Sequence, residues 1–194
     1  MTSTTTMQGP DGTGQPHAQT CAHHWMTKPL CRRHERTLFI QFSFKMREPS
    51  GATKQLWRWA LGMLASGECE VLGAWPATAS HDRLLREHLR ERGVERIGAL
   101  LGDETLARVM GVPVARPPLK ESGIAAMVRA AQLQAKIERA VSRESPFEDF
   151  DSACACIARV FEKAERAELV QQRRGLRDQW RAIRSQSPAP AGGA

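Results

Sequence analysis

The sequence lacks the features of a membrane protein and of a secreted one. Its 194 residues contain no apolar run of about eighteen or more, so no membrane span is predicted. The N-terminal stretch MTSTTTMQGPDGTGQP has no apolar centre of the kind that a signal peptide needs. The five cysteines are odd in number and follow no disulfide framework, which is typical of reduced thiols. These absences together predict a cytoplasmic protein.

The signatures of the common small-molecule enzymes are also missing. The sequence has no glycine-rich loop that could cradle a phosphate, no dinucleotide fingerprint, and no recognisable Ser/His/Asp or Cys/His arrangement. A conventional small-molecule enzyme is therefore not expected. The charge balance favours an acidic partner instead, because 28 Lys and Arg against 21 Asp and Glu give a formal net charge of +7. Nucleic acid is the commonest partner of that kind, although the excess of charge is mild.

Alternating hydrophobic patterns predict three strands in the first half of the chain. The first strand carries one apolar face, formed by Leu38, Ile40, Phe42, Phe44 and Met46. The second follows a turn-prone EPSG stretch and carries Trp57, Trp59, Leu61 and Met63 on one face. The third follows the turn ASGE and contains Val71, Leu72 and Trp75. Short loops join the three strands, so they are expected to pair antiparallel.

The apolar spacing then changes to the helical period. Ser80 is the predicted N-cap, Asp82 lies in the first turn, and Gly93 follows the last turn. Residues 94–101 then form a buried strand. A strand, a helix and a strand within about thirty residues predict a crossover that makes the fourth strand parallel to another strand of the sheet.

Helices are predicted in the second half. A short helix around residues 106–110 ends at Gly111, and a proline-rich linker follows. The next helix spans residues 122–141, with an apolar stripe of Ile124, Met127, Val128, Ala131, Ile137 and Val141. Another runs from about Asp149 to Arg174, and a basic helix follows. The expected organisation is therefore a disordered basic leader (1–36), a sheet core (37–112), a helical region (119–184) and a disordered tail (185–194), which makes the fold class α+β.

Two groups of residues suggest binding sites. Cys21, His24, Cys31 and His34 are spaced as C-x2-H-x6-C-x2-H, which supplies the paired ligands of a tetrahedral zinc site. The alternative is an unstructured basic lead-in whose cysteines occur by chance. The second group could contact phosphates and consists of Arg173, Arg174, Arg177, Arg181 and Arg184. The alternative is a solvated helix face, since Glu165, Glu168 and Asp178 lie nearby in the sequence.

Three phrases in the central stretch carry a family resemblance: WALGMLASGECEVLGAWPA, LREHLRERGVERI and GALLGD. In this order and at this spacing, over residues 37–110, they resemble the catalytic core of Mutator-type bacterial insertion-sequence transposases. The resemblance implies a partial ribonuclease-H-like sheet of three antiparallel strands, a crossover helix and a fourth strand, followed by C-terminal helices. It implies DNA as a partner, with self-association or an intact transposase as further partners.

Transposases of this kind cut and rejoin DNA with carboxylates that hold two divalent metal ions, usually Mg²⁺. The resemblance implies that Asp103 is the second of these acids, and so a catalytic residue and metal ligand. Ordinary capping of the following helix is the alternative role for Asp103. The first acid falls at Gln41, whose neutral amide cannot replace a bridging carboxylate. The stand-ins for the third acid have no family phrase around them and are Glu162, Glu165 and Glu168.

These departures predict a shortened or degenerate relative. Its expected function is that of a transposase-like DNA-binding protein, related to DNA transposition and recombination and catalytically incomplete. Mg²⁺ would be its cofactor only if a catalytic site survives. Two other functions stay open on the sequence alone. One is a non-catalytic helical protein that binds or regulates another protein, and the other is a small zinc-dependent nucleic-acid-binding module.

Overall fold

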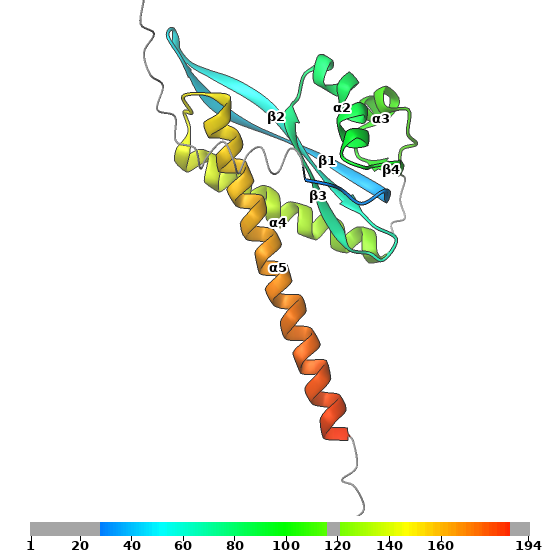
Figure 1. Ribbon diagram of the computed structural model, residues 1–194. Helices are drawn as coiled ribbons and strands as arrows, with labels where there is room; N and C mark the ends of the chain where they lie inside the picture. The colour runs from blue at the N-terminus through cyan, green and yellow to red at the C-terminus, as the bar shows by residue number, and fades with distance from the viewer. Residues whose placement is uncertain (1–27, 116–120, 187–194) are drawn as a thin grey trace, which may run out of the picture.

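The computed structural model describes residues 28–115 and 121–186 (Figure 1). The described chain has an α+β fold, as predicted, in which a four-stranded mixed sheet is followed by two long C-terminal helices. In chain order its elements are β1 Arg33–Glu48, β2 Gly51–Met63, β3 Cys69–Pro76, α2 Ala79–Glu91, β4 Arg96–Leu101, α3 Glu104–Met110, α4 Glu121–Glu144 and α5 Phe150–Gln186. The predicted tail from residue 187 onward and most of the predicted leader lie outside the described residues.

The strand order in the sheet is β3-β2-β1-β4. β1 and β2 form a long antiparallel hairpin, and β3 pairs antiparallel with the other edge of β2. β4 is parallel to β1, with Leu38 opposite Leu101. The helix α2 is the crossover that joins β3 to β4. The predictions of three antiparallel strands and a parallel fourth strand are therefore confirmed.

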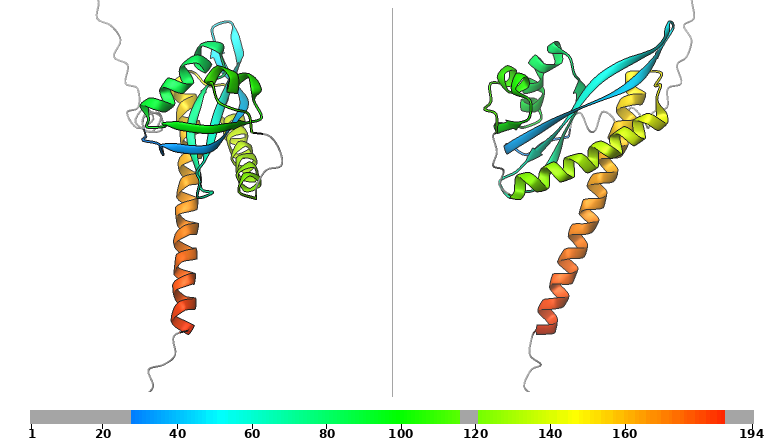
Figure 2. Two further views of the ribbon diagram at one scale, coloured as in Figure 1. Left: turned by 90° about the vertical axis from the view of Figure 1, so that its right-hand side faces the viewer. Right: turned by 180° about the vertical axis from the view of Figure 1, so that it is seen from behind.

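Each face of the sheet carries its own hydrophobic core, because successive side chains of a strand point to opposite faces. On one face, Phe44 of β1 and Trp59 of β2 pack with α4 and α5. On the other face, Phe39 of β1 and Trp75 of β3 pack with α2 and α3. Figure 2 shows these two pairs of helices on opposite sides of the sheet.

The crossover helix α2 begins two residues earlier than predicted for a Ser80 cap. Its N-cap is Thr78, whose hydroxyl accepts a hydrogen bond from the backbone N–H of His81 at 3.4 Å. Asp82 lies in the first turn, as predicted, and Gly93 follows the last turn with a φ of 100°. The positive φ favours glycine at this position, because a side chain there would be strained.

The helix α4 packs on the sheet through a different stripe from the one predicted. Ile137 and Val141 are buried as expected, but Ile124, Met127 and Val128 are each about half exposed, at 54%, 46% and 53%. The buried stripe runs instead through Ala126, Ala130, Leu133, Ile137, Ala140 and Val141. The small alanines let α4 approach β1 closely. Gln134 anchors the helix, because its side chain accepts a hydrogen bond from the Trp59 indole at 2.6 Å and donates one to the Gln41 carbonyl at 3.2 Å.

The helix α5 is one continuous helix of 37 residues, where two successive helices were predicted. At a rise of about 1.5 Å per residue it is roughly 55 Å long. Its first half packs on the sheet through buried Ala153, Ile157 and Phe161. Its second half projects away from the sheet (Figures 1 and 2). Despite this length, neither α5 nor any other helix within the two described ranges is apolar enough to cross a membrane.

Candidate functional site

Gln41 and Asp103 occupy the positions of the first and second acids that the resemblance implied. Arg58 of β2 is the residue that both of them neighbour. Gln41 is exposed on β1 and lies opposite Arg58 of β2. Asp103 follows β4 and is the N-cap of α3, where its Oδ1 accepts a hydrogen bond from the backbone N–H of Leu106 at 2.8 Å. This is the helix-capping role that the sequence left open beside the catalytic one.

A buried arginine lies between these elements. The Nη1 of Arg58 is 3.0 Å from Oδ1 of Asp82, in the first turn of α2. The same nitrogen is 4.0 Å from Oδ2 of Asp103. Arg58 is only 5% exposed, so its charge is largely withdrawn from water. We call Arg58, Asp82 and Asp103 the Arg58 cluster.

The Arg58 cluster is held by charge more than by hydrogen bonds. The Asp82 contact does not have hydrogen-bond geometry, and Arg58 Nε, Arg58 Nη1 and Asp82 Oδ1 have no hydrogen-bond partner among the described residues. Burial raises the pKa of the Asp82 carboxyl, Arg58 lowers it, and the negative charge of Asp103 raises it further, so that the net shift is upward. Removing Arg58 would leave two carboxylates facing each other without a positive charge between them in a largely dry site, which is costly.

The residues at this position do not fit a magnesium site. Mg²⁺ needs hard oxygen ligands with room to coordinate them. Here the guanidinium of Arg58 already supplies the positive charge that Asp82 and Asp103 face. Gln41 offers only a neutral amide, and no group of three or more His, Cys, Asp or Glu in the described part of the chain could hold a metal ion. Among the described residues, this position therefore lacks the set of oxygen ligands that Mg²⁺ needs.

Arg58 and Asp82 were not singled out as site residues by sequence reasoning, although a signal was present. Arg58 stands between Trp57 and Trp59 in an apolar strand, so strand alternation puts it on the face opposite the two tryptophans. That face also carries Ala60 and Trp75 and is covered by α2 and α3. A charged residue in such a position needs a buried partner of opposite sign.

The three glutamates considered as the third acid do not approach Asp103. They belong to α5, which packs on the face of the sheet opposite to α3. Each forms an ion pair there: Glu162 with Arg166 at 3.7 Å, Glu165 with Lys28, and Glu168 with Arg129. The structure therefore does not bring the three predicted acid positions together.

The predicted zinc set is only partly described, since Cys21 and His24 lie outside the described residues. His34 is 1% exposed within β1, and its Nε2 is 3.1 Å from Oε2 of Glu70. Glu70 also accepts a hydrogen bond from the backbone N–H of Cys31 at 3.0 Å. Burial raises the pKa of Glu70, but the hydrogen bonds from His34 and Cys31 lower it more, so that the net shift is downward. His34 thus serves as a packed partner of Glu70.

The predicted phosphate-contacting arginines lie on the projecting half of α5. Arg173, Arg174 and Arg177 are exposed there. Arg181 and Arg184 belong to the same helix, but their side chains lie outside the described residues. The alternative, a solvated helix face, rested on Glu165, Glu168 and Asp178. Glu165 and Glu168 pair with Lys28 and Arg129 of the body, whereas Asp178 is exposed on the same half of α5 as the arginines.

Comparison with models of known protein families gives no match for this chain, and a search of the curated proteins gives none either.

Proposed function

We propose that the chain is a transposase-like DNA-binding protein, related to DNA transposition and recombination, that is catalytically incomplete. Its elements follow the order that the resemblance implied: three antiparallel strands, a crossover helix, a parallel fourth strand and C-terminal helices. This order is consistent with a partial ribonuclease-H-like sheet. It supports the fold part of the proposal only, and DNA binding rests on the surface.

The observation that carries DNA binding is the row of exposed arginines on the projecting half of α5. Arg173, Arg174 and Arg177 extend from a helix on which Glu165 and Glu168 pair with the body, so that Asp178 is the acidic residue that remains beside the arginines among the described residues. Arginine donates five N–H groups in a planar fork that matches phosphate geometry. A rigid helix that projects into solvent can approach a duplex without a clash from the sheet.

The Arg58 cluster supports the part of the proposal that says the protein is catalytically incomplete. A DDE-type reaction needs carboxylates that hold divalent metal ions against the DNA phosphate. In this chain Asp103 caps α3 and faces Arg58, and the position on β1 carries Gln41. The protein would therefore bind DNA without cutting it.

Fluorescence anisotropy with a labelled DNA duplex tests the binding, over about 50–300 mM salt. We expect affinity that falls steeply with salt, because each phosphate contact adds about 0.9 to the slope of log affinity against log salt. The variant with Arg173→Gln, Arg174→Gln and Arg177→Gln should lower that slope. No binding of the unaltered protein at the lowest salt would refute the proposed function.

A strand-cleavage assay on supercoiled plasmid with Mg²⁺ tests the catalytic part separately. We expect no nicked or linear product above that seen with the Asp103→Ala variant. Nicking by the unaltered protein that Asp103→Ala abolishes would show that a catalytic site survives.

A specific observation also favours the second function, a non-catalytic helix that binds another protein. Leu169, Val170 and Leu176 are exposed on α5 by 50%, 48% and 57%. Exposed apolar residues on a projecting helix are typical of a helix that packs against a partner. Concentration-dependent association in light scattering, together with no affinity for DNA, would favour this function over the first.

A further inference from the structure

A basic groove of about 850 Å³ lies between α4 and α5. Five cationic side chains from the two helices line it: Lys136, Arg139, Arg143, Arg159 and Lys163. Two carboxylates, Glu138 and Glu144, also line it, so five positive and two negative charges leave a net charge of +3. The groove therefore attracts anions.

Within residues 28–115 and 121–186, the cations contributed by α4 are not neutralised by carboxylates. Glu144 pairs with Arg159 across the groove, and Glu138 accepts a hydrogen bond from Gln134. Lys136, Arg139 and Arg143 form no ion pair with any residue that the structure describes. The two arginines use their Nε to bond backbone carbonyls one turn earlier, at 3.0 and 3.3 Å. The remaining guanidinium N–H groups lie outside these bonds.

The groove continues as a stripe along α5. Arg159 and Lys163 line the groove, and the stripe extends from them through Arg166, Arg173 and Arg177. At about 100° per residue, these five residues fall within roughly 80° of one another around the helix axis, and Val170 shares the same sector. All five cations are exposed. The row exists because α5 is one continuous helix. The two successive helices expected from the sequence would not have aligned these residues.

The stripe has a length suited to duplex DNA. Arg177 lies 18 residues after Arg159, which is a distance of about 27 Å along the helix axis and most of a B-DNA turn of about 34 Å. The carboxylates of Glu165 and Glu168 lie on other sectors of α5 and pair with the body. Beyond the groove, Glu162 pairs with Arg166 of the stripe at 3.7 Å.

We propose that the groove and the stripe form one continuous surface for the sugar–phosphate backbone of duplex DNA. This proposal rests on the proposed DNA binding and extends its surface from the end of α5 to α4. The α4 cations would hold one stretch of phosphates in the groove, while the α5 stripe follows the backbone outward. Charge complementarity favours a phosphate backbone over an acidic protein, because the cations continue in a row from one helix to the other.

The test compares two triple variants with the unaltered protein, using the same labelled duplex and the same salt series. The groove variant carries Lys136→Gln, Arg139→Gln and Arg143→Gln. If each of the three cations contacts one phosphate, the salt slope falls by about 2.7. The affinity loss between about 50 and 200 mM salt then becomes roughly 40-fold smaller than that of the unaltered protein.

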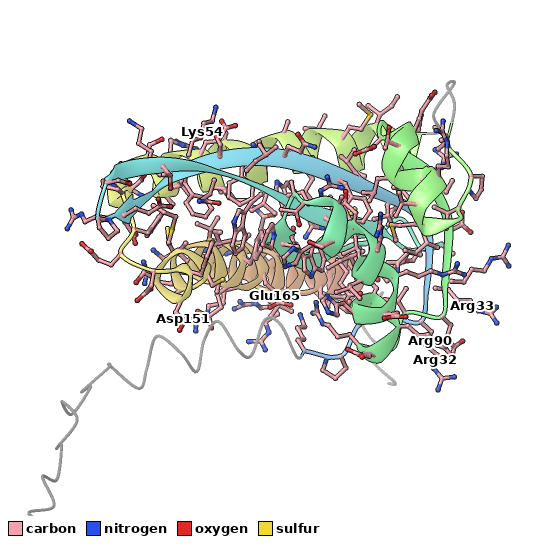
Figure 3. The ribbon with its side chains drawn as sticks, turned by 90° about the horizontal axis from the view of Figure 1, so that it is seen from above. Arg32, Arg33, Lys54, Arg90, Asp151 and Glu165 are labelled. Carbon is pink, nitrogen blue, oxygen red and sulfur yellow. The ribbon has the colours of Figure 1, made fainter. Side chains whose placement is uncertain are left out.

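The matched control carries Arg83→Gln, Arg86→Gln and Arg90→Gln on α2. These residues have the same i, i+3, i+7 spacing and are exposed, and the variant has the same net charge as the groove variant. They lie on α2, which packs on the other face of the sheet, and the Arg90 side chain points outward there (Figure 3). Glu87 and Glu91 alternate with them, so two carboxylates offset part of the charge of the three arginines and the local excess is smaller than in the groove. We expect the control to change the salt slope by less than about 1.

The outcomes separate this proposal from the proposed function. Equal slopes for the groove variant and the control would overturn the groove proposal and leave DNA binding by α5 intact. A groove variant that loses affinity for single-stranded RNA but keeps its duplex DNA affinity would also overturn it. Absence of binding by the unaltered protein would refute the proposed function itself. Circular dichroism melts of both variants should match the unaltered protein, because all six side chains are exposed.

Discussion

A single added methyl group would disturb a close contact between β2 and β1. A Cβ added at Gly62 would be 2.3 Å from Cδ2 and 2.9 Å from Nε2 of His34. His34 is 1% exposed and its Nε2 contacts Glu70, so the ring is enclosed by the protein and held on one side by this carboxylate. The Gly62→Ala substitution must therefore displace the imidazole or spread the two strands.

The cost of Gly62→Ala follows from two effects. Overpacking a well-packed site costs about 1–3 kcal/mol. Displacing the ring also weakens its hydrogen bond to the Glu70 carboxylate, and hydrogen bonds to charged groups contribute about 1.5–3 kcal/mol. Because a small shift relieves part of the clash and weakens the bond only partly, we expect a total loss of about 2–4 kcal/mol.

Gly175→Ala is the matched control, because it adds the same methyl group where nothing lies within 4 Å. Gly175 is in the exposed half of α5, and replacing a helical glycine by alanine stabilises a helix by about 0.8–1 kcal/mol. Urea denaturation followed by tryptophan fluorescence should show a lower free energy of unfolding for Gly62→Ala. The same measurement should show no loss for Gly175→Ala.

A double-mutant cycle then tests the physical cause. In a His34→Ala background the ring that Gly62→Ala would strike is absent, so the second substitution should cost less than about 1 kcal/mol. A cost of about 2–4 kcal/mol that stays the same with and without the imidazole would refute the clash as its origin. A loss below about 0.5 kcal/mol for Gly62→Ala alone would show that the ring moves freely.

The other predictions use acid, thiol chemistry and charge. The pKa of Glu70 is below its usual 4.5 in the folded protein, so its stabilisation is complete above that pH and is lost as the pH falls further. Glu70→Gln should flatten the acid limb of a stability–pH curve. Burial raises the pKa of Cys154 and Cys156 to about 11, so Ellman's reagent at pH 8 should label both slowly until the protein unfolds. Asp82→Asn should cost less than about 1 kcal/mol in urea titrations at pH 7, because burial and Asp103 already disfavour the charged Asp82 carboxylate and Asp103 still faces Arg58.

Strand alternation and turn chemistry were enough to predict the sheet. The apolar residues of β1 from Phe42 to Met46 are buried on one face, as expected. The change of period after β3 located the crossover helix, and β4 is parallel to β1 as the crossover rule requires. These features depend on local patterns, so a single sequence contains them.

The helical region was less predictable, because hydrophobicity alone does not choose the face of a helix that packs. In α4 the larger Ile124 and Val128 are exposed, while Ala126 and Ala130 are buried. Alanine lets the helix lie close to the sheet, and this depends on the shape of β1 and β2. The continuity of α5 through Gly175 was not apparent either, because glycine is unfavourable inside a helix. Its cost is only about 1 kcal/mol, and the helix continues through it.

For the Arg58 cluster, the sequence pointed to Asp103 but not to the contacts that Asp103 makes. Asp103 was placed correctly after β4, and its capping role was one of the two roles considered. Its partner Arg58 comes from β2, and Asp82 comes from α2, so the contact depends on three elements packing together. The α5 arginines were found by composition, but their alignment with the α4 groove needed the crossing of two helices.

The Arg58 cluster leads to a last prediction about metal ions. If Arg58 supplies the charge that Asp82 and Asp103 face, Mg²⁺ gains little by binding there and should not stabilise the fold. A site with a dissociation constant of about 1 mM would raise the free energy of unfolding by roughly 1.4 kcal/mol in 10 mM Mg²⁺. For a chain of this size that corresponds to about 3–6 °C in the melting midpoint. Calorimetry should show no such shift between EDTA and 10 mM Mg²⁺. A shift of that size that Asp103→Asn abolishes would show that the carboxylates bind the metal despite Arg58.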